Sequence, residues 1–166
     1  MENERILVFS DVHGDRNAIE AIRKAERELL ADSIFSLGDL CPDPYDSAWR
    51  GIAGVRGNMD RWYEYGDLPF PPREMVREKN GRKIVMIHGN EVPSVTLERG
   101  DILLYGHTHV AKAEERNGVY YLNPGSASRP RSSLGPTFAI LDDTSFTLFS
   151  LLDFKLISTL IFSSSQ

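Results

Sequence analysis

Short apolar runs separated by polar segments are the main pattern in the first half of the chain. Residues 5–10 and 33–37 are each a brief apolar run bounded by polar residues, which predicts two buried strands. Between them, residues 15–31 place apolar side chains three and four positions apart, the spacing of an amphipathic helix. Asp15 or Asn17 is available to cap that helix. A strand, a helix and a strand in this order predict a right-handed βαβ unit.

The pattern changes from α/β to mostly β along the chain. A third strand is expected at 51–55 and further strands in the second half, where turn signals separate the apolar runs. Asn-Gly dipeptides at 80–81 and 117–118 favour two-residue hairpin turns, and a third antiparallel pair is expected to turn near 142–143. We therefore expect an α/β fold, a single domain over residues 1–166 with two stacked sheets and flanking helices.

Composition narrows the class of protein. The chain is 41% hydrophobic and 26% charged, as expected of a globular protein, and its net charge of −5 without a basic cluster argues against a nucleic-acid surface. One cysteine, Cys41, excludes a disulfide within the chain, and residues 1–10 lack a signal-peptide pattern, so we expect a cytoplasmic location. The apolar stretch 146–162 is interrupted by Asp153 and Lys155, so we expect closing strands rather than a membrane span. An exposed interaction patch and a homo-oligomer are the alternatives for this stretch.

A metal-competent side chain follows each of five apolar runs, usually beside a glycine. The carboxyl ends of neighbouring parallel strands meet at one edge of a sheet, where ligands bind. Each side chain alone has an ordinary structural interpretation, as a helix cap, a turn residue or a buried histidine with hydrogen bonds. All four histidines of the chain fall at these positions, which favours a shared metal site over separate structural roles. The seven predicted ligands are Asp11, His13, Asp39, Asn58, His88, His107 and His109.

This ligand set predicts two divalent ions rather than one. Imidazole and carboxylate ligands without thiolate suit Mn, Fe, Zn, Co or Ni, and seven ligands exceed what one tetrahedral ion takes. Asp39 is the natural bridge, because its strand lies between the strands that carry the others. Two ions about 3.5–4 Å apart clamp the attacking and leaving oxygens of a phosphoryl displacement. With both aspartates and a bridging hydroxide, the centre keeps a charge of about +1, which attracts phosphate.

The motifs D-x-H, G-D, R-G-N-x-D, H-G and G-H-T-H, in this order, resemble those of the calcineurin-like metallophosphoesterases. The NPGS segment at 123–126 is similar to that of their small, single-domain phosphodiesterase branch, and the likeness runs from about residue 5 to residue 131. It implies a four-layer α-β-β-α sandwich and a dinuclear site, with manganese as the first expectation. It also implies that one ion is bound by Asp11, His13, Asp39 and His109, and the other by Asp39, Asn58, His88 and His107.

The resemblance also implies roles in catalysis and a reaction. A metal-bridging hydroxide would attack phosphorus in line, Asn58 would also touch a phosphate oxygen, and Asp60 would orient the ligands around it. Arg131, and Arg129 beside it, are candidates to hold a substrate phosphate, although solvated loop arginines are an equal alternative. Many family members carry a histidine after the motif asparagine, where this chain has Met59. We therefore expect phosphodiesters, or esters with good leaving groups, to react better than alkyl monoesters.

Two other functions fit the same motifs. A scaffold subunit of the retromer sorting complex resembles this family but acts as a binding module. A protein phosphatase or dinucleoside-polyphosphate phosphatase of the superfamily is the second alternative. We favour a phosphodiesterase acting on a small phosphate ester, because every ligand position is kept.

Several further side chains near the motifs have two interpretations. Cys41 is a redox-sensitive neighbour of the metals or, as we favour, a small buried hydrophobe. The aromatic residues stack on a nucleobase or, as we favour, pack in the core and in interfaces. These aromatic residues are Trp49, Trp62, Tyr63 and Tyr65.

Overall fold

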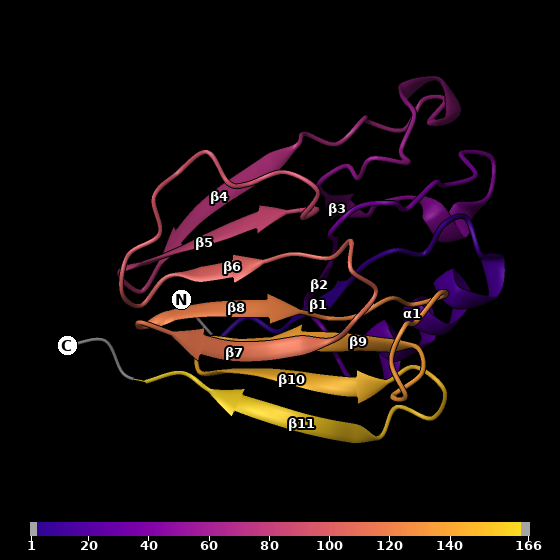
Figure 1. Ribbon diagram of the computed structural model, residues 1–166. Helices are drawn as coiled ribbons and strands as arrows, with labels where there is room; N and C mark the ends of the chain where they lie inside the picture. Colours follow the sequence, from indigo (N-terminus) through magenta and orange to yellow (C-terminus); the bar gives the residue numbers. More distant parts are fainter. Residues whose placement is uncertain (1–2, 164–166) are drawn as a thin grey trace.

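Two stacked β-sheets form the body of the protein in the computed structural model, which describes residues 3–163 (Figure 1). One sheet has the order β11-β10-β9-β1-β2-β3 and the other the order β4-β5-β6-β8-β7. The strands of the first sheet are β1 (Ile6–Phe9), β2 (Ser33–Ser36), β3 (Ala53–Gly54), β9 (Thr137–Leu141), β10 (Ser145–Ser150) and β11 (Leu156–Ile161). Those of the second are β4 (Glu74–Lys79), β5 (Arg82–Ile87), β6 (Ile102–Leu104), β7 (Lys112–Arg116) and β8 (Val119–Asn123). The predicted α/β class and the two mixed sheets are confirmed.

Parallel strands lie at the centre of each sheet and end on the same side of the molecule. β1 pairs in parallel with β2, and β2 with β3, while β5, β6 and β8 are parallel in the other sheet. Figure 1 shows β5, β6 and β8 pointing toward the side on which α1 (Arg16–Glu28) lies. The loops that follow these strands therefore meet at one end of the sandwich.

The predicted βαβ unit is confirmed as β1, α1 and β2. The side chain of Asp15 caps α1 by accepting a hydrogen bond from the Ala18 backbone N–H at 3.1 Å. The apolar face of α1 packs in one core cluster with Leu7 of β1 and Phe138 of β9. This cluster fixes β1, and hence the loop after it, against the helix.

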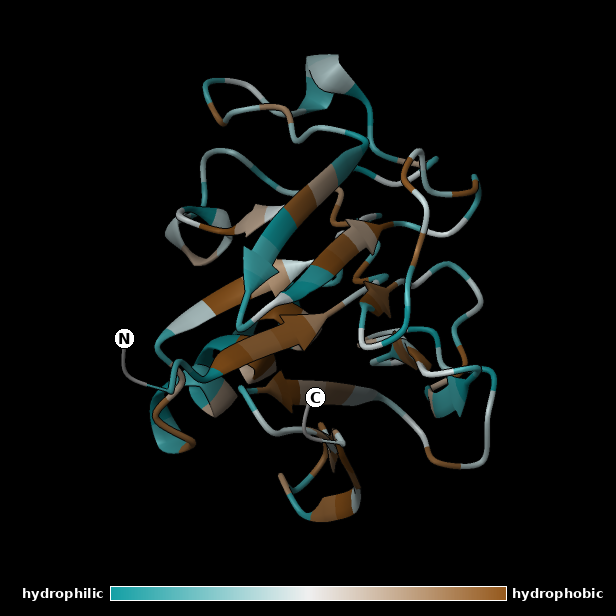
Figure 2. Ribbon diagram, turned by 90° about the vertical axis from the view of Figure 1, so that its left-hand side faces the viewer, coloured by the Kyte–Doolittle hydropathy of each residue, from teal (hydrophilic) through white to brown (hydrophobic). Residues whose placement is uncertain are grey.

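A second core cluster lies between the sheets and holds them together. Val8 and Leu37 from the first sheet meet Leu104 and Leu122 from the second, and all four are buried. Figure 2 shows that the strands are mainly hydrophobic, whereas the loops are mostly hydrophilic or intermediate.

The outer face of the second sheet is covered by irregular chain rather than by helix. Val95 and Leu97 pack on Val85 of β5, and none of residues 88–101 is helical. Helices on both outer faces were expected from the four-layer resemblance, and the structure differs here. Pro93, with the glycines at both ends of this segment, disfavours a continuous helix. The two short 3-10 turns of the described chain, η1 (Ser47–Trp49) and η2 (Trp62–Glu64), lie elsewhere.

The hairpins follow the predicted turns. Both residues of each Asn-Gly dipeptide have positive φ, 55° and 77° at residues 80–81 and 54° and 81° at residues 117–118, as a type I′ turn requires. The stretch 146–162 forms β10 and β11, so the predicted closing strands are confirmed, although Ile161 on the outer strand β11 is 67% exposed. Within residues 3–163 we find no helix with the length and apolarity that a bilayer crossing requires.

Candidate metal centre

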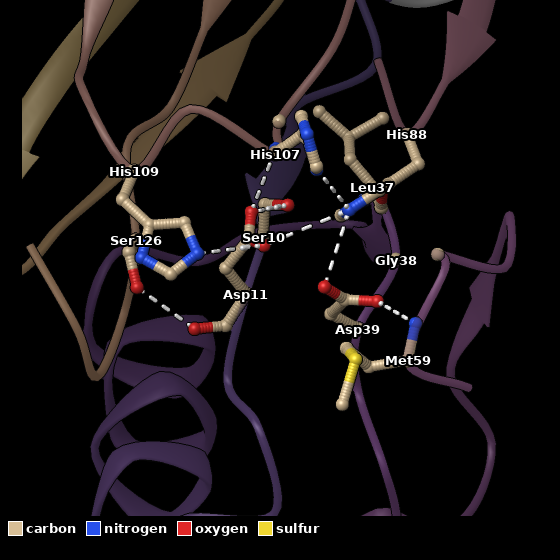
Figure 3. Close-up of polar contacts among 12 residues, drawn as sticks. Ser10, Asp11, Leu37, Gly38, Asp39, Met59, His88, His107, His109 and Ser126 are labelled. Atoms are coloured by element: carbon tan, nitrogen blue, oxygen red, sulfur yellow. Dashed lines mark hydrogen bonds and ion pairs between the residues drawn. The ribbon is translucent and has the colours of Figure 1, made fainter. Parts of the chain in front are cut away.

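The side chains of six predicted ligands converge where the loops after β1, β2, β5 and β6 meet. Figure 3 shows five of them, Asp11, Asp39, His88, His107 and His109, pointing toward one another. His13 joins them from the loop after β1. The seventh predicted ligand, Asn58, is more exposed and lines a cavity together with Asp39 and His109.

The four imidazoles form two close pairs. Nε2 of His13 lies 3.3 Å from Nε2 of His109, and Nδ1 of His107 lies 3.3 Å from Nε2 of His88. His13 and His109 are 96 positions apart in the sequence and come from loops of different sheets, whereas His88 and His107 both follow strands of the second sheet. The first pair therefore forms only when the two sheets have packed together.

Two carboxylates lie between the histidine pairs. Oδ1 of Asp11 is 3.2 Å from Nε2 of His109 and 3.8 Å from Nε2 of His88. Oδ2 of Asp39 is 3.2 Å from Nε2 of His88 and 3.8 Å from Nε2 of His13. Oδ1 of Asp11 is also 3.6 Å from Nε2 of His13, so each carboxylate faces at least one histidine of each pair.

Two sets of ligand atoms are compact enough to hold an ion. Asp11, His13 and His109 offer atoms within 4.8 Å of one another, and so do Asp11, Asp39 and His88. Asp11 belongs to both sets, whereas the sequence predicted Asp39 as the shared carboxylate. The identity of the bridging carboxylate stays a prediction, which the substitutions in the Discussion address.

One buried oxygen of Asp11 fits a cation directly. Oδ1 of Asp11 is buried and has no hydrogen-bond partner among the described residues, although three imidazole nitrogens lie within 3.8 Å of it. A buried carboxylate oxygen without a partner is costly, and a bound cation would remove that cost. The residues present therefore fit a divalent metal centre.

Backbone carbonyls orient two of the histidines toward this centre. Nδ1 of His88 is 2.8 Å from the carbonyl oxygen of Leu37, and Nδ1 of His109 is 2.7 Å from that of Arg129. An N–H donated to these carbonyls leaves the Nε2 lone pair facing the carboxylates, as in metal-binding histidines.

The backbone at the ligands has a rare conformation. A left-handed backbone at a residue other than glycine costs roughly 1–2 kcal/mol and clusters at functional sites. Half of the ten such residues in the described chain are predicted ligands. They are Asp11 (φ 56°), His13 (φ 51°), Asp39 (φ 53°), His107 (φ 68°) and His109 (φ 65°).

Glycines beside the ligands leave room for their side chains. A Cβ on Gly57 would collide with Oδ1 of Asp39, and a Cβ on Gly106 would collide with the hydroxyl of Ser10. The close approach that we expected at these glycines is therefore found, because the absence of a Cβ leaves room for the side chains of Asp39 and Ser10.

Asp60 holds the backbone around Asp39. Its Oδ2 accepts hydrogen bonds from the N–H groups of Asp39 and Gly57, both at 2.8 Å. Its Oδ1 accepts from the N–H of Cys41 and the hydroxyl of Tyr65, both at 2.9 Å. Burial and the neighbouring Asp60 raise the pKa of Tyr65, which keeps that hydroxyl protonated and donating. Asp60 therefore acts on the ligands through the backbone.

The NPGS segment connects two ligand loops, a role that the sequence did not reveal. Nδ2 of Asn123 donates to the carbonyl oxygen of Gly106 at 3.1 Å, and the hydroxyl of Ser126 donates to the carbonyl oxygen of Asp11 at 2.8 Å. A turn was expected there from Pro and Gly alone. The hydroxyl of Ser10, which donates to Oδ2 of Asp11 at 2.6 Å, was also missed, because no sequence signal marks a single serine.

The protonation behaviour of the centre favours positive charge inside it. Burial alone would raise the pKa of Asp11, but the neighbouring His13 imidazole, the hydrogen bond from Ser10 and the charge of His88 hold it below its usual value. Burial alone would lower the pKa of His88, but the Asp39 hydrogen bond and the Asp11 charge raise it. Both shifts have the same cause, the mutual attraction of the carboxylates and the imidazole, so the carboxylates favour positive charge at this place.

Two cavities open on either side of Asn58. One, of about 390 Å³, is lined by His88, Arg73 and Glu91 among others, and we call it the His88-side cavity. The other, of about 530 Å³, is lined by His13, His109, Arg129 and Arg131 among others, and we call it the His109-side cavity. Asn58 lines both, so a group bound at the ligands reaches either cavity.

The aromatic residues lie outside both cavities. Trp49 and Tyr65 are buried, with 2% and 3% exposure, as the favoured packing role requires. Trp62 and Tyr63 are exposed on the surface at 74% and 60%, and neither lines a cavity at the ligands. The structure therefore offers no stack of aromatic rings beside the predicted ligands among the described residues.

Known proteins share this sequence pattern and this fold. The calcineurin-like phosphoesterase superfamily domain matches residues 5–145. The chain belongs to the calcineurin-like phosphoesterase superfamily. Phosphodiesterase YfcE of Escherichia coli strain K12 is 27% identical over 93% of this chain and 96% of its own length. "Probable metallophosphoesterase YsnB" of Bacillus subtilis strain 168 is 30% identical over 82% of each chain.

Solved structures confirm the superfamily fold. That of YfcE from E. coli superposes with a TM-score of 0.83 at 23% identity, covering 96% of this chain and all of YfcE. Wild-type Vps29 of Entamoeba histolytica complexed with Zn²⁺ gives 0.69 at 24% identity, covering 96% and 99% of the two chains. The predicted class of enzyme, a metal-dependent phosphoric ester hydrolase of the calcineurin-like phosphoesterase superfamily, is confirmed by this membership and by the named phosphodiesterase relative.

Proposed function

We propose that the protein is a phosphodiesterase that acts on small phosphate esters with two divalent transition-metal ions, manganese being the first expectation. The observation that carries this proposal is the buried Oδ1 of Asp11, which lacks a hydrogen-bond partner among the described residues and faces three imidazoles. The YfcE relative, named a phosphodiesterase, supports the reaction type.

Each ion would be held by one histidine pair and the carboxylates. One ion is proposed to take Asp11, His13, Asp39 and His109, and the other Asp39, Asn58, His88 and His107. When bound, two such ions supply Lewis acidity, lower the pKa of a water molecule and favour in-line attack on phosphorus.

The remaining residues bind and orient the substrate. Asn58, at the junction of the two cavities, is proposed to donate a hydrogen bond to a phosphoryl oxygen and to help hold an ion. Arg131 would attract the negative charge of the substrate from the wall of the His109-side cavity. Asp60 would keep Asp39 in place through the backbone, which makes it a positioning residue rather than a proton donor, because both of its oxygens already accept hydrogen bonds.

No histidine remains to protonate the leaving group. All four histidines lie in the cluster of predicted ligands, and Met59 at the rim carries no proton to donate. An ester whose alcohol can leave without being protonated is therefore the better substrate. An aryl diester is such an ester.

The test is a substrate panel with a metal measurement. Protein loaded with manganese should hydrolyse bis(4-nitrophenyl) phosphate faster than an alkyl monoester, and elemental analysis should find two ions per chain. Protein that binds metal but turns over neither ester would favour a binding module of the Vps29 kind. Faster turnover of a phosphoprotein or a dinucleoside polyphosphate would favour the other branches of the superfamily.

A further inference from the structure

The two cavities beside the ligands differ sharply in charge. In the His88-side cavity, Arg73 is paired with Glu91, and the Arg56 guanidinium donates to the carbonyl oxygen of Pro71 at 3.0 Å. In the His109-side cavity, Asp39, a predicted ligand, is the only acidic residue of the described chain in the lining. The first cavity is close to neutral and the second has an excess of positive charge.

That excess comes from two arginines without partners. Among the described residues, neither the guanidinium of Arg129 nor that of Arg131 makes an ion pair or a hydrogen bond, and both side chains are exposed. Seven of the fourteen arginines, among them Arg16, Arg23 and Arg50, pair with carboxylates instead. Two unpaired guanidinium groups on one cavity wall form a site for an anion.

The backbone holds both arginines at the metal centre. The carbonyl oxygen of Arg129 lies 2.7 Å from Nδ1 of His109, and the N–H of Arg131 donates to the carbonyl oxygen of His109 at 2.9 Å. The hydroxyl of Ser128 donates to the carbonyl oxygens of Asp11 and Val12, at 3.0 Å and 2.7 Å. The arginines therefore start from a fixed position beside the ligands, unlike the arginines of a free loop.

Charge balance determines what these arginines attract. With two divalent ions, two aspartates and a hydroxide, the centre carries about +1, which one phosphodiester of charge −1 neutralises. The two guanidinium groups then remain unmatched. A phosphate monoester, with a charge of about −1.5 to −2 at pH 7, matches them.

We propose that Arg129 and Arg131 form a subsite for a terminal phosphate, so that the preferred substrate is a phosphodiester with a second phosphate group on one of its two ester arms. The phosphorylated arm lies in the His109-side cavity and the uncharged arm in the His88-side cavity. This inference rests on the proposed function, because it assumes that a diester binds at the ligands.

The first experiment compares two diesters that differ in one group. These are 4-nitrophenyl ethyl phosphate and its analogue with a phosphate on the terminal carbon of the ethyl arm. We expect kcat/KM of the manganese-loaded protein to be at least about tenfold higher for the phosphorylated diester. In Arg129→Gln/Arg131→Gln, which keeps every backbone hydrogen bond of the segment, the ratio of the two values should fall to about one.

A control variant removes one positive charge elsewhere. Arg27 lies in the last turn of α1, about 16 Å along the helix from the end nearest the ligands, and has no ion pair among residues 3–163. Arg27→Gln should leave both kcat/KM values at those of the parent protein. An equal loss of kcat/KM for both diesters in the double variant would show that the arginines hold the scissile phosphate, and would overturn the proposal. Equal kcat/KM values for the two diesters in the parent protein would overturn it as well.

A binding measurement separates this inference from the proposed function. Calorimetry on the manganese-loaded protein should give a Kd at least about tenfold lower for 2-phosphoethyl phosphate than for ethyl phosphate, with the difference lost in the double variant. If neither diester is turned over, the proposed function fails, and this titration alone decides the subsite. Equal Kd values for the two phosphates would then reject the subsite.

Discussion

At the scale of single residues, substitutions of the two buried carboxylates test how many ions the centre holds. Asp39→Asn should weaken both ions and abolish turnover, because the amide removes a negative charge that faces both histidine pairs. Elemental analysis and the rate with bis(4-nitrophenyl) phosphate measure the two effects, and circular dichroism shows that the fold is kept. Two ions per chain with full activity would remove Asp39 from the bridging role.

Asp11→Asn is the companion substitution, since Asp11 is shared by both compact ligand sets. If Asp11 is the shared carboxylate in place of Asp39, its variant should lose both ions, and Asp39→Asn should lose only one. The pattern of metal loss across the two variants therefore assigns the bridge.

Asp60→Asn should lower the rate while metal stays bound. Its amide nitrogen would face two hydrogen-bond donors that now reach a carboxylate oxygen, which costs about 1–3 kcal/mol and displaces the backbone of Asp39. Turnover, metal content and urea denaturation measure the three quantities. Tyr65→Phe is the milder control, because it removes one of the four donors and should cost about 1 kcal/mol. Loss of metal in Asp60→Asn would instead make Asp60 a ligand.

Cys41 should behave as an unreactive thiol. Burial, together with the charges of Asp60 and Asp39, raises its pKa to about 12. A raised thiol pKa leaves the neutral form dominant at pH 8, and the thiolate is the reactive form. In metal-free protein, its reaction with a disulfide reagent at pH 8 should be at least about tenfold slower than that of glutathione. The rate should still be rising at pH 10, and a plateau near pH 9 would contradict the shift.

The predicted ligands could be read from the sequence because each follows an apolar run. Their supporting partners could not, since Ser126 is 115 positions from Asp11 in the sequence and nothing local marks the role of Tyr65. A serine or tyrosine becomes a partner only through the tertiary fold. Sequence reasoning therefore found the charged and imidazole groups, and it missed the hydroxyl groups that hold them.

At the scale of elements, local turn chemistry predicted the hairpins well. An Asn-Gly pair satisfies two positive φ angles by itself, so β4–β5 and β7–β8 could be placed from sequence. The strand expected at 51–55 is reduced to Ala53 and Gly54, because only these residues pair with β2 at the sheet edge. The hydrophobic pattern of a segment indicates which residues are buried, but the length of the strand depends on how many residues pair with the neighbouring strand.

The turn between β4 and β5 offers a test of this local control. Gly81→Ala should lower the free energy of unfolding by about 1 kcal/mol, since alanine is disfavoured at φ 77°. Gly118→Ala should cost more, because the new Cβ would also collide with the Arg99 side chain. Urea denaturation of both variants measures the difference. An unchanged midpoint for Gly81→Ala would contradict the type I′ geometry.

At the scale of the whole molecule, the metal centre joins the two sheets. Asp11 and Asp39 follow strands of the first sheet, while His88, His107 and His109 follow strands of the second. Bound ions would therefore stabilise the association of the sheets as well as the loops.

Removing the ions should lower the thermal stability of the molecule. A ligand at a hundred times its Kd stabilises the folded state by about 2.7 kcal/mol, so chelation should lower Tm by several degrees. Differential scanning calorimetry with EDTA, and again after manganese is restored, measures this change. Asp39→Asn should respond less to the chelator than the parent protein. Equal Tm values for the manganese-loaded and the metal-free protein would show that metal binding does not stabilise the sandwich.

The ligands come from both halves of the chain, so they emerge at different times during synthesis. The last predicted ligand is His109, and the segment that ties the loops together extends to Ser128. A growing chain that has emerged only as far as β5 has both carboxylates but lacks three of its four imidazoles, those of His88, His107 and His109. If the proposed ions bind, they can therefore be held in full only after the two sheets have packed, which makes ion binding a late step in folding.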